Sequence, residues 1–203
     1  TYLYSTFKDE LGRALVAKFG ASAVDPGNKA FDIKETSSRV EADVAPFFEH
    51  RRYRPNGTYE VGVELLPDNR NPLQVVNWPK QHHSNGVNKN NTTGRRYKSL
   101  VRILKHIRNE MGDSPQYAHR TVPGFLIECL VWNVPNNLMV GNDYETMVRS
   151  ALTYLYKNTL DYELCSEWGE VSELKYLFRG PQPWSFKQAN DFTVAAWNYL
   201  GYD

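Results

Sequence analysis

The sequence predicts an α+β protein in which a sheet lobe is followed by an all-helical lobe. After one helical segment, the first 90 residues contain short alternating runs separated by Gly, Pro and Asn turn signals. Residues 91–203 instead contain long segments in which apolar residues recur at helical spacing. Strands followed by a run of helices indicate an α+β fold or a sheet domain joined to a helical one. We therefore expect two domains, 1–90 and 91–203.

The composition is that of a globular protein without a general affinity for polyanions. The 203 residues are 41% hydrophobic and 23% charged, and the formal net charge is +1. Any electrostatic binding site must therefore be local. The sequence contains no run of about 18 apolar residues and no secretion leader, so we expect no membrane association and a cytoplasmic location. Cys129 and Cys165 lie in apolar or helical surroundings, which predicts reduced thiols and no disulfides.

The sheet lobe is expected to begin with a helix that ends at Gly20. Its apolar residues recur at near-helical spacing and are Leu3, Phe7, Leu11, Leu15 and Phe19. A strand is expected at 30–34, and a second from Arg39 that continues to Tyr53. The turn signal Pro55-Asn56-Gly57 should join this strand to 59–66 as a hairpin. A short strand at 73–78 completes the lobe.

The segment 79–93, PKQHHSNGVNKNNTT, is expected to be a polar loop because it lacks apolar periodicity. Ordered loops of this length are usually functional, so we place the domain boundary and an active cleft near it. His82 and His83 are adjacent and have no Cys or Glu at ligand spacing, which argues against a zinc site. Lysines and amides instead suit contacts with phosphates and base edges.

Helices are expected in the second lobe at 95–111, 122–134, 143–158 and 184–200. The first is strongly amphipathic and the second is nearly all apolar. Thr92 or Thr93 is a candidate N-cap for the first helix. Ser185 and Gln188 have the spacing of a capping box for the last.

Two acidic residues lie two positions apart in RVEADVAPFF. Strand alternation places Val40, Ala42 and Val44 on one face, and Glu41 and Asp43 on the other. A carboxylate in the middle of a strand is usually solvated, paired or bound to a metal. The pair is therefore either the solvated face of an edge strand or a metal site of the kind used in phosphoryl transfer.

The helix at 95–111 carries a line of cations opposite much of its apolar stripe. Lys98, Arg102 and Lys105 share one stripe with Asn109, and this stripe contains no acid until Glu110. A solvated helix face usually mixes charges of both signs. The stripe could therefore neutralise phosphates, although an ordinary solvated face remains the alternative.

Three separated blocks resemble one known family. RVEADVAPFFEHRRY, NWPKQHHSNGVNKNNTTGRRYKSLVRILKHIRNEM and PGFLIECLVWNVP follow one another as in bacterial CD-NTases, the cGAS-like and oligoadenylate-synthase-like nucleotidyltransferases of antiphage signalling. The resemblance implies a polymerase-beta-like nucleotidyltransferase sheet lobe, partial here, joined to a helical lobe with the active site between them. It implies that ATP, GTP or other nucleoside triphosphates are joined into a cyclic di- or trinucleotide with release of pyrophosphate. A regulatory protein partner is among the expected partners.

The same resemblance implies roles for particular residues. Two Mg²⁺ (or Mn²⁺) ions are held by three carboxylates, of which Asp43 matches the third. Glu41 shares its face and is the weaker metal candidate. Lys98 and Lys105 match the helix that contacts triphosphates, and Lys89 and Asn90 match the segment that enters it; together with Arg102 they form the expected substrate-binding set.

One departure from the family concerns its first signature, a Gly-Ser turn followed by an Asp-x-Asp strand. Gly20-Ala21-Ser22 is followed by Asp25-Pro26, and proline does not suit the interior of that strand. We expect the signature to lie before Thr1, and we expect the 203 residues alone to be inactive because a two-metal mechanism needs all three acids. The alternatives are a non-catalytic nucleotide- or RNA-binding module with the same fold, and a purely structural interaction domain.

Overall fold

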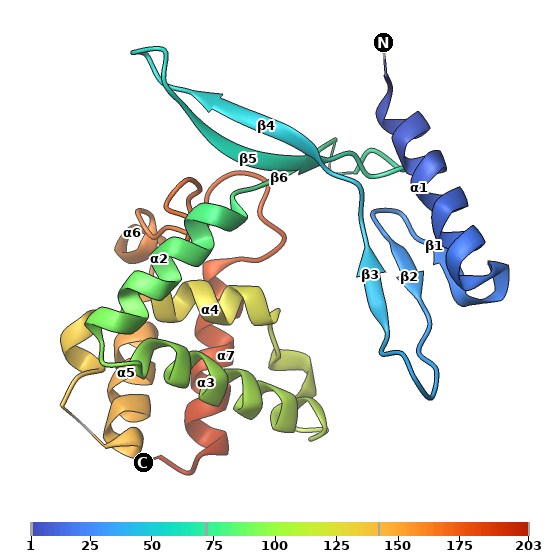
Figure 1. The fold of residues 1–203 in the computed structure, drawn as a ribbon. Coiled ribbons are helices and arrows are strands. Elements are labelled where there is room, and N and C mark those ends of the chain that lie inside the picture. The colour runs from blue at the N-terminus through green and yellow to red at the C-terminus, as the bar shows by residue number, and fades with distance from the viewer. Residues whose placement is uncertain (1, 72, 142, 203) are drawn as a thin grey trace. The chain divides into compact units, whose positions relative to one another are not determined.

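The computed structural model describes residues 2–71, 73–141 and 143–202, and it confirms the α+β class (Figure 1). The chain forms two compact units, Thr1–Pro79 and Lys80–Asp203. The first contains the strands and the second is helical. The sequence led us to place the boundary between residues 90 and 91, because we expected a loop at 79–93.

Helix α1 (Tyr4–Phe19) packs on a three-stranded antiparallel sheet in the first unit. The strands are β1 (Val24–Pro26), β2 (Phe31–Ile33) and β3 (Ala42–Val44), in the order β1-β2-β3. Their inner face forms a small core with α1 that contains Leu15, Val24, Phe31 and Ile33. The predicted helix end is confirmed, since Gly20 has a φ of 88° that L side chains rarely adopt.

A second antiparallel sheet contains β4 (Phe48–Tyr53), β5 (Tyr59–Leu65) and β6 (Val75–Asn77). The predicted hairpin is confirmed, with Tyr53 opposite Tyr59. The expected continuous strand to Tyr53 is wrong: β3 ends at Val44, and Pro46, which has no N–H for a ladder, lies in the gap before β4. Val40, which the expected strand included, lies before β3 and is 81% exposed, since β3 begins only at Ala42.

Lys8 joins α1 to the loops of the first unit. Its buried ammonium donates to the carbonyls of Gly27 and Asn28 at 2.8 and 3.3 Å, and to Asp68 Oδ2 at 2.6 Å. One cation thus satisfies acceptors on the β1–β2 turn and on the segment after β5, which compensates for its own burial. The first unit therefore depends on a polar anchor as well as on its small apolar core.

The second unit is built around an apolar helix, α4 (Gly124–Asn133). Leu126, Ile127, Cys129, Leu130 and Val131 of α4 are fully buried. Around it lie α3 (Arg96–Gly112), α5 (Tyr144–Asn158) with the N-cap Asp143, the short α6 (Tyr162–Cys165) and α7 (Phe186–Tyr199) with the predicted capping box at Ser185. The four predicted helices are confirmed, whereas α6 was not expected.

The expectation of a loop at 79–93 is wrong, because Pro79–Thr92 forms helix α2. Proline is well tolerated in the first turn of a helix, where its missing N–H has no partner to lose. The inner face of α2 uses small and polar residues in place of large apolar ones. Gly86 is buried, and a Cβ there would lie 3.8 Å from Tyr97 Cε1 and 3.9 Å from Val171 Cγ1. Asn85 Nδ2 donates to the carbonyl of Val171 at 2.9 Å. Tertiary contacts thus stabilise a helix that shows no apolar period.

We predict that Lys8→Met lowers the free energy of unfolding of the first unit by about 2–3 kcal/mol, because it removes the charge-assisted hydrogen bonds that the buried ammonium makes to three acceptors. Urea unfolding followed by circular dichroism measures the change. Lys18→Met is the matched control, since Lys18 lies exposed in the last turn of the same helix and should change stability by less than about 0.5 kcal/mol. Equal effects of the two substitutions would contradict the anchor.

Candidate functional site

Asp43 lies on the solvent face of the first sheet. Asp25 is opposite Asp32, and Asp32 is opposite Asp43, so the three side chains share one face of β1, β2 and β3. All three are exposed, whereas Phe31 and Ile33 on the other face of β2 are buried. The alternation therefore places Asp43 as the sequence predicted, on the polar face of a strand.

Asp43 is a carboxylate without a protein partner among the residues that the structure describes. Asp25, in the same row, pairs with Lys34 at 3.0 Å, while the Asp43 side chain makes no hydrogen bond or ion pair within 2–71, 73–141 and 143–202. Glu41 is exposed and precedes β3 by one residue. In those same ranges no group of three His, Cys, Asp or Glu side chains could hold a metal. Asp43 thus fits the part of one oxygen ligand to a hard cation, which would take its other ligands elsewhere.

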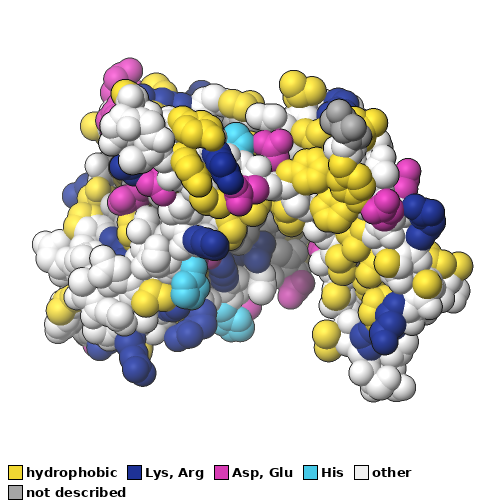
Figure 2. Space-filling view, turned by 45° about the horizontal axis from the view of Figure 1, so that its top comes forward, with side chains coloured by type: hydrophobic (Ala, Val, Ile, Leu, Met, Phe, Trp, Pro, Cys, Tyr) yellow, Lys and Arg dark blue, Asp and Glu magenta, His cyan; other side chains and the backbone are white. Residues whose placement is uncertain are grey.

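The predicted cation stripe lies on α3 in the second unit. Lys98 and Arg102 are exposed, and Lys105 is partly buried. Lysine, arginine and histidine side chains gather on the face of the helical unit that Figure 2 shows. The exposed part of the predicted stripe is therefore Lys98 and Arg102, on one helix of a chain whose net charge is only +1.

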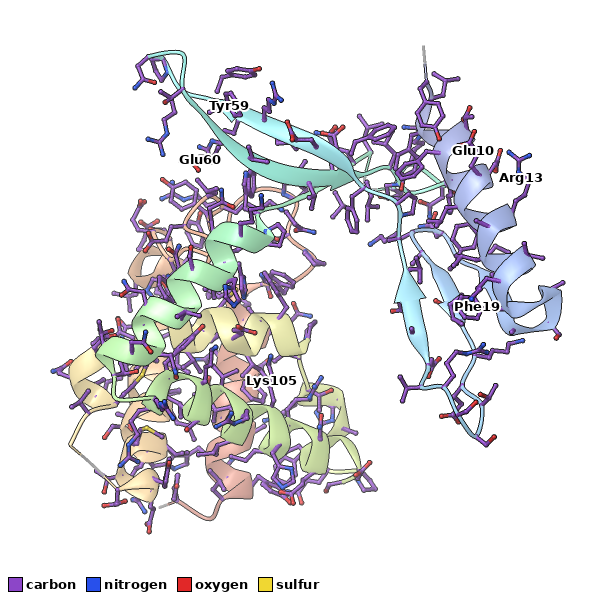
Figure 3. The ribbon with its side chains drawn as sticks, viewed as in Figure 1. Glu10, Arg13, Phe19, Tyr59, Glu60 and Lys105 are labelled. Carbon is purple, nitrogen blue, oxygen red and sulfur yellow. The ribbon has the colours of Figure 1, made fainter. Side chains whose placement is uncertain are left out.

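Lys105 is paired with an acid that the sequence analysis missed. Lys105, which Figure 3 labels on α3, donates from Nζ to Glu128 Oε2 at 3.1 Å. His82 Nε2 lies 3.1 Å from Glu128 Oε1. The hydrogen bond from His82, followed by the interaction with Lys105, lowers the pKa of Glu128 to about 2 against the opposing effect of burial. Three helices, α2, α3 and α4, thus each contribute one side chain to this cluster.

A signal for Glu128 was present in the sequence. Glu128 is the only charged residue in GFLIECLVWN, and a lone carboxylate in an apolar helix needs partners. The partners themselves could not be identified, because His82 belongs to the segment expected to be a loop. The neighbouring residues His82 and His83 differ in exposure, since His82 is partly buried and His83 is exposed.

Lys89 and Asn90 both have structural contacts within the second unit. Lys89 Nζ donates to the carbonyl of Val134 at 2.9 Å and lies over the Trp132 ring, and burial lowers the pKa of Lys89 to about 8. Asn90 Oδ1 accepts the backbone N–H of Lys98 at 3.1 Å in the first turn of α3.

The expected N-cap of α3 takes a modified form. Thr93 Oγ1 accepts the N–H of Tyr97 at 3.1 Å, although the residue at the cap position itself is Arg95, which has a φ of 67°. Together with Asn90, Thr93 satisfies N–H groups that a helix start leaves without intrahelical partners. The α2–α3 junction thus sets where the cation stripe begins.

Comparisons with known proteins identify the class of molecule. Residues 84–201 match the family model of the cGAS/DncV-like nucleotidyltransferase C-terminal helical domain. The structure is similar to that of the Elizabethkingia meningoseptica CdnE cyclic dinucleotide synthase solved with GTP and Apcpp, with a TM-score of 0.90, 33% identity, and coverage of 99% of this chain and 72% of that one. The fold is therefore that of a nucleotidyltransferase with a helical C-terminal domain.

Curated relatives extend the match to the whole chain. The cyclic dipyrimidine nucleotide synthase CdnE of Cecembia lonarensis is 44% identical over 100% of this chain and 68% of its own length. The synthase of the same name from Legionella pneumophila is 40% identical over 98% of this chain and 66% of its own length. The chain thus spans about two thirds of these relatives. It belongs to the cGAS/DncV-like nucleotidyltransferases, the CD-NTase family, which confirms the resemblance found in the sequence.

Two further observations concern membrane-spanning helices and the two cysteines. Within the described ranges, no helix combines the length and the apolar character needed to cross a membrane. Cys129 and Cys165 are free, buried thiols, and burial raises the pKa of both. A buried thiol with a raised pKa is a packing residue rather than a nucleophile.

We predict that Asn90→Ala lowers the free energy of unfolding by about 1 kcal/mol, because the N–H of Lys98 loses its acceptor. Asn90→Asp keeps a side-chain oxygen at this position and should stay close to the wild type. Urea unfolding measures both, with the exposed neighbour Asn91→Ala as control. A loss of nucleotide binding without any loss of stability in Asn90→Ala would instead favour a direct contact with substrate.

A second prediction concerns pH. Because the pKa of Glu128 lies near 2 in the folded protein and its ordinary value is 4.5, the ionised carboxylate stabilises the fold above about pH 4.5. This contribution is lost as the pH falls toward 2. Between pH 5 and 2, the free energy of unfolding should therefore fall by up to about 3 kcal/mol more in the wild type than in Glu128→Gln. Urea titrations at a series of pH values test this, and parallel curves would contradict it.

Proposed function

We propose that the whole protein is a cyclic nucleotide synthase that joins nucleoside triphosphates and releases pyrophosphate. The observation that carries the proposal is the match of the entire chain to cyclic dinucleotide synthases, one of them solved with GTP and a nucleotide analogue. The exposed Asp43 and the cation stripe of α3 support it, because they are the two kinds of group that phosphoryl transfer requires.

In this proposal, Asp43 contributes one carboxylate to a two-metal site, with Glu41 as a weaker candidate. Mg²⁺ (or Mn²⁺), when bound, would neutralise the developing charge on the reacting phosphates. Magnesium prefers oxygen ligands and is commonly held by one or two carboxylates together with substrate phosphates, which suits an exposed and unpaired aspartate.

The cations of α3 are assigned to the triphosphate. Lys98, Arg102 and Lys105 supply N–H donors and positive charge that neutralise phosphate oxygens and hold the leaving pyrophosphate in line. Lys89 and Asn90 belong to the proposed substrate-binding set by their place in the chain. Their contacts within the helical unit support this set indirectly, because Asn90 holds the backbone of Lys98.

We further propose that the enzyme acts in antiphage signalling in the cytoplasm and answers to a regulatory protein partner, as the family resemblance implies. The competing function is a metal-independent nucleotide- or RNA-binding module. The two differ in their response to magnesium and to salt: a synthase binds nucleotide more tightly with Mg²⁺, whereas a binding module depends steeply on ionic strength and little on metal.

We predict that Asp43→Asn in the whole protein reduces cyclic product formation by about a hundredfold or more, since one charged group at the reacting phosphates is lost. Because Asp43 is exposed and its carboxylate makes no ion pair among the described residues, the fold should be kept, with a melting temperature no lower than that of the wild type. Chromatographic product analysis with nucleoside triphosphates and Mg²⁺ measures the effect. Asp32→Asn, its neighbour across the sheet, is the matched control and should retain activity. Turnover of Asp43→Asn at the wild-type rate would refute the assignment.

A further inference from the structure

His82, Glu128 and Lys105 form a cluster of paired polar side chains within the helical unit. Resting on the proposed function, in which Lys105 contacts the triphosphate, we propose that Glu128 is a positioning residue. It fixes the Lys105 ammonium in the geometry that phosphate binding needs, and His82 in turn fixes Glu128. The cluster therefore sets how tightly the triphosphate is held, beyond the charge of the stripe itself.

The placement of Glu128 explains why its carboxylate is fixed. Glu128 lies on α4 between the fully buried Ile127 and Cys129, and its side chain is only 27% exposed. Both carboxylate oxygens have a donor, since Oε1 faces His82 Nε2 and Oε2 accepts from Lys105 Nζ, each at 3.1 Å. A partly buried charge with both oxygens satisfied has one strongly preferred orientation.

His82 is itself held from two sides. Its ring stacks on Phe125 of α4, with ring centroids 5.5 Å apart and an interplanar angle of 29°. The same ring points Nε2 at Glu128 Oε1. Because the stacking partner and the acceptor both lie on α4, His82 ties α2 to α4 in one orientation and restricts the rotation of the carboxylate.

The stem of Lys105 is guided as well. The stem packs beside the start of α4, since a Cβ on Gly124 would lie 3.5 Å from Lys105 Cε, which is an ordinary van der Waals contact. The ammonium has three N–H donors, of which one goes to Glu128. Lys105 is 34% exposed, and its remaining donors can therefore reach a ligand.

A positioning role of Glu128 and simple neutralisation of Lys105 by Glu128 predict opposite changes in phosphate affinity when the carboxylate is removed. If Glu128 merely neutralised Lys105, its removal would expose more positive charge and strengthen phosphate binding. If it positions Lys105, its removal frees a flexible four-carbon chain, which must then be ordered at each binding event, and phosphate binding weakens. Substitution of the carboxylate by the isosteric amide therefore separates the two by the sign of the effect.

The test measures the affinity of the whole protein for inorganic tripolyphosphate by calorimetry, without Mg²⁺, so that metal contacts do not contribute. Glu128→Gln and Lys105→Met should each weaken binding about fivefold to tenfold, and the double variant should be no weaker than Lys105→Met alone, because both act through one contact. His82→Phe keeps an aromatic ring but loses the hydrogen bond to Glu128, and it should weaken tripolyphosphate binding about threefold. If Glu128→Gln does not fold, His82→Phe tests the positioning role in its place.

Glu110→Gln is the matched control. It removes a carboxylate of α3 that also pairs with a histidine, His106 at 3.3 Å, but that does not touch Lys105, and its affinity should equal that of the wild type. Steady-state kinetics of the whole protein should show a raised KM with little change in kcat for Glu128→Gln, a split that a loss of folded protein would not give.

Three results overturn the inference, and they can be told apart. Wild-type or tighter binding by Glu128→Gln, together with weakened binding by Lys105→Met, removes Glu128 as a positioning residue and leaves the proposed function intact. Unchanged binding by Lys105→Met removes Lys105 from the proposed substrate-binding set, and the positioning role of Glu128 with it. Additive losses in the double variant would also overturn it.

Discussion

The helical unit depends on how it accommodates one carboxylate in an apolar helix. α4 contributes five fully buried side chains to the core, and apart from Glu128 it carries no charged side chain. Burying an unpaired carboxylate costs several kcal/mol, so donors must come from the neighbouring helices. His82 comes from α2 and Lys105 from α3, and each reaches a different oxygen. One acid thereby fixes the positions of two helices relative to α4.

This constraint also explains where prediction from the sequence succeeded and failed. Amphipathic periodicity identified α3 and α5, and turn chemistry identified the β4–β5 hairpin, because both signals are local. α2 has no apolar period, since its contacts run through Gly86, Asn85 and His82 rather than through large apolar side chains. Such contacts exist only once the partner helices are in place, so no local sequence pattern predicts them.

The candidate site shows the same difference between features that local sequence patterns predict and contacts that form only between separate helices. The exposure of Asp43 follows from strand alternation, and the cation stripe follows from helical spacing, so both could be derived from the sequence. The pairing of Lys105 with Glu128 joins residues from different helices and could not. Lys89 and Asn90 are residue types that suit phosphate contacts. In the fold, however, Lys89 donates to a backbone carbonyl and Asn90 accepts a backbone N–H, both within the helical unit.

The polar face of the first sheet bears on the proposed role of Asp43 as a cation ligand. Like charges directly opposite one another weaken a sheet, and Asp25, Asp32 and Asp43 lie in one such row. Lys34 offsets only Asp25, at 3.0 Å. A threonine at position 43 would suit an exposed strand better and would relieve the repulsion. Asp32 and Asp43 are both left without an ion pair among the described residues, so in the proposed function a cation that arrives with the substrate and binds Asp43 would relieve the repulsion along this row.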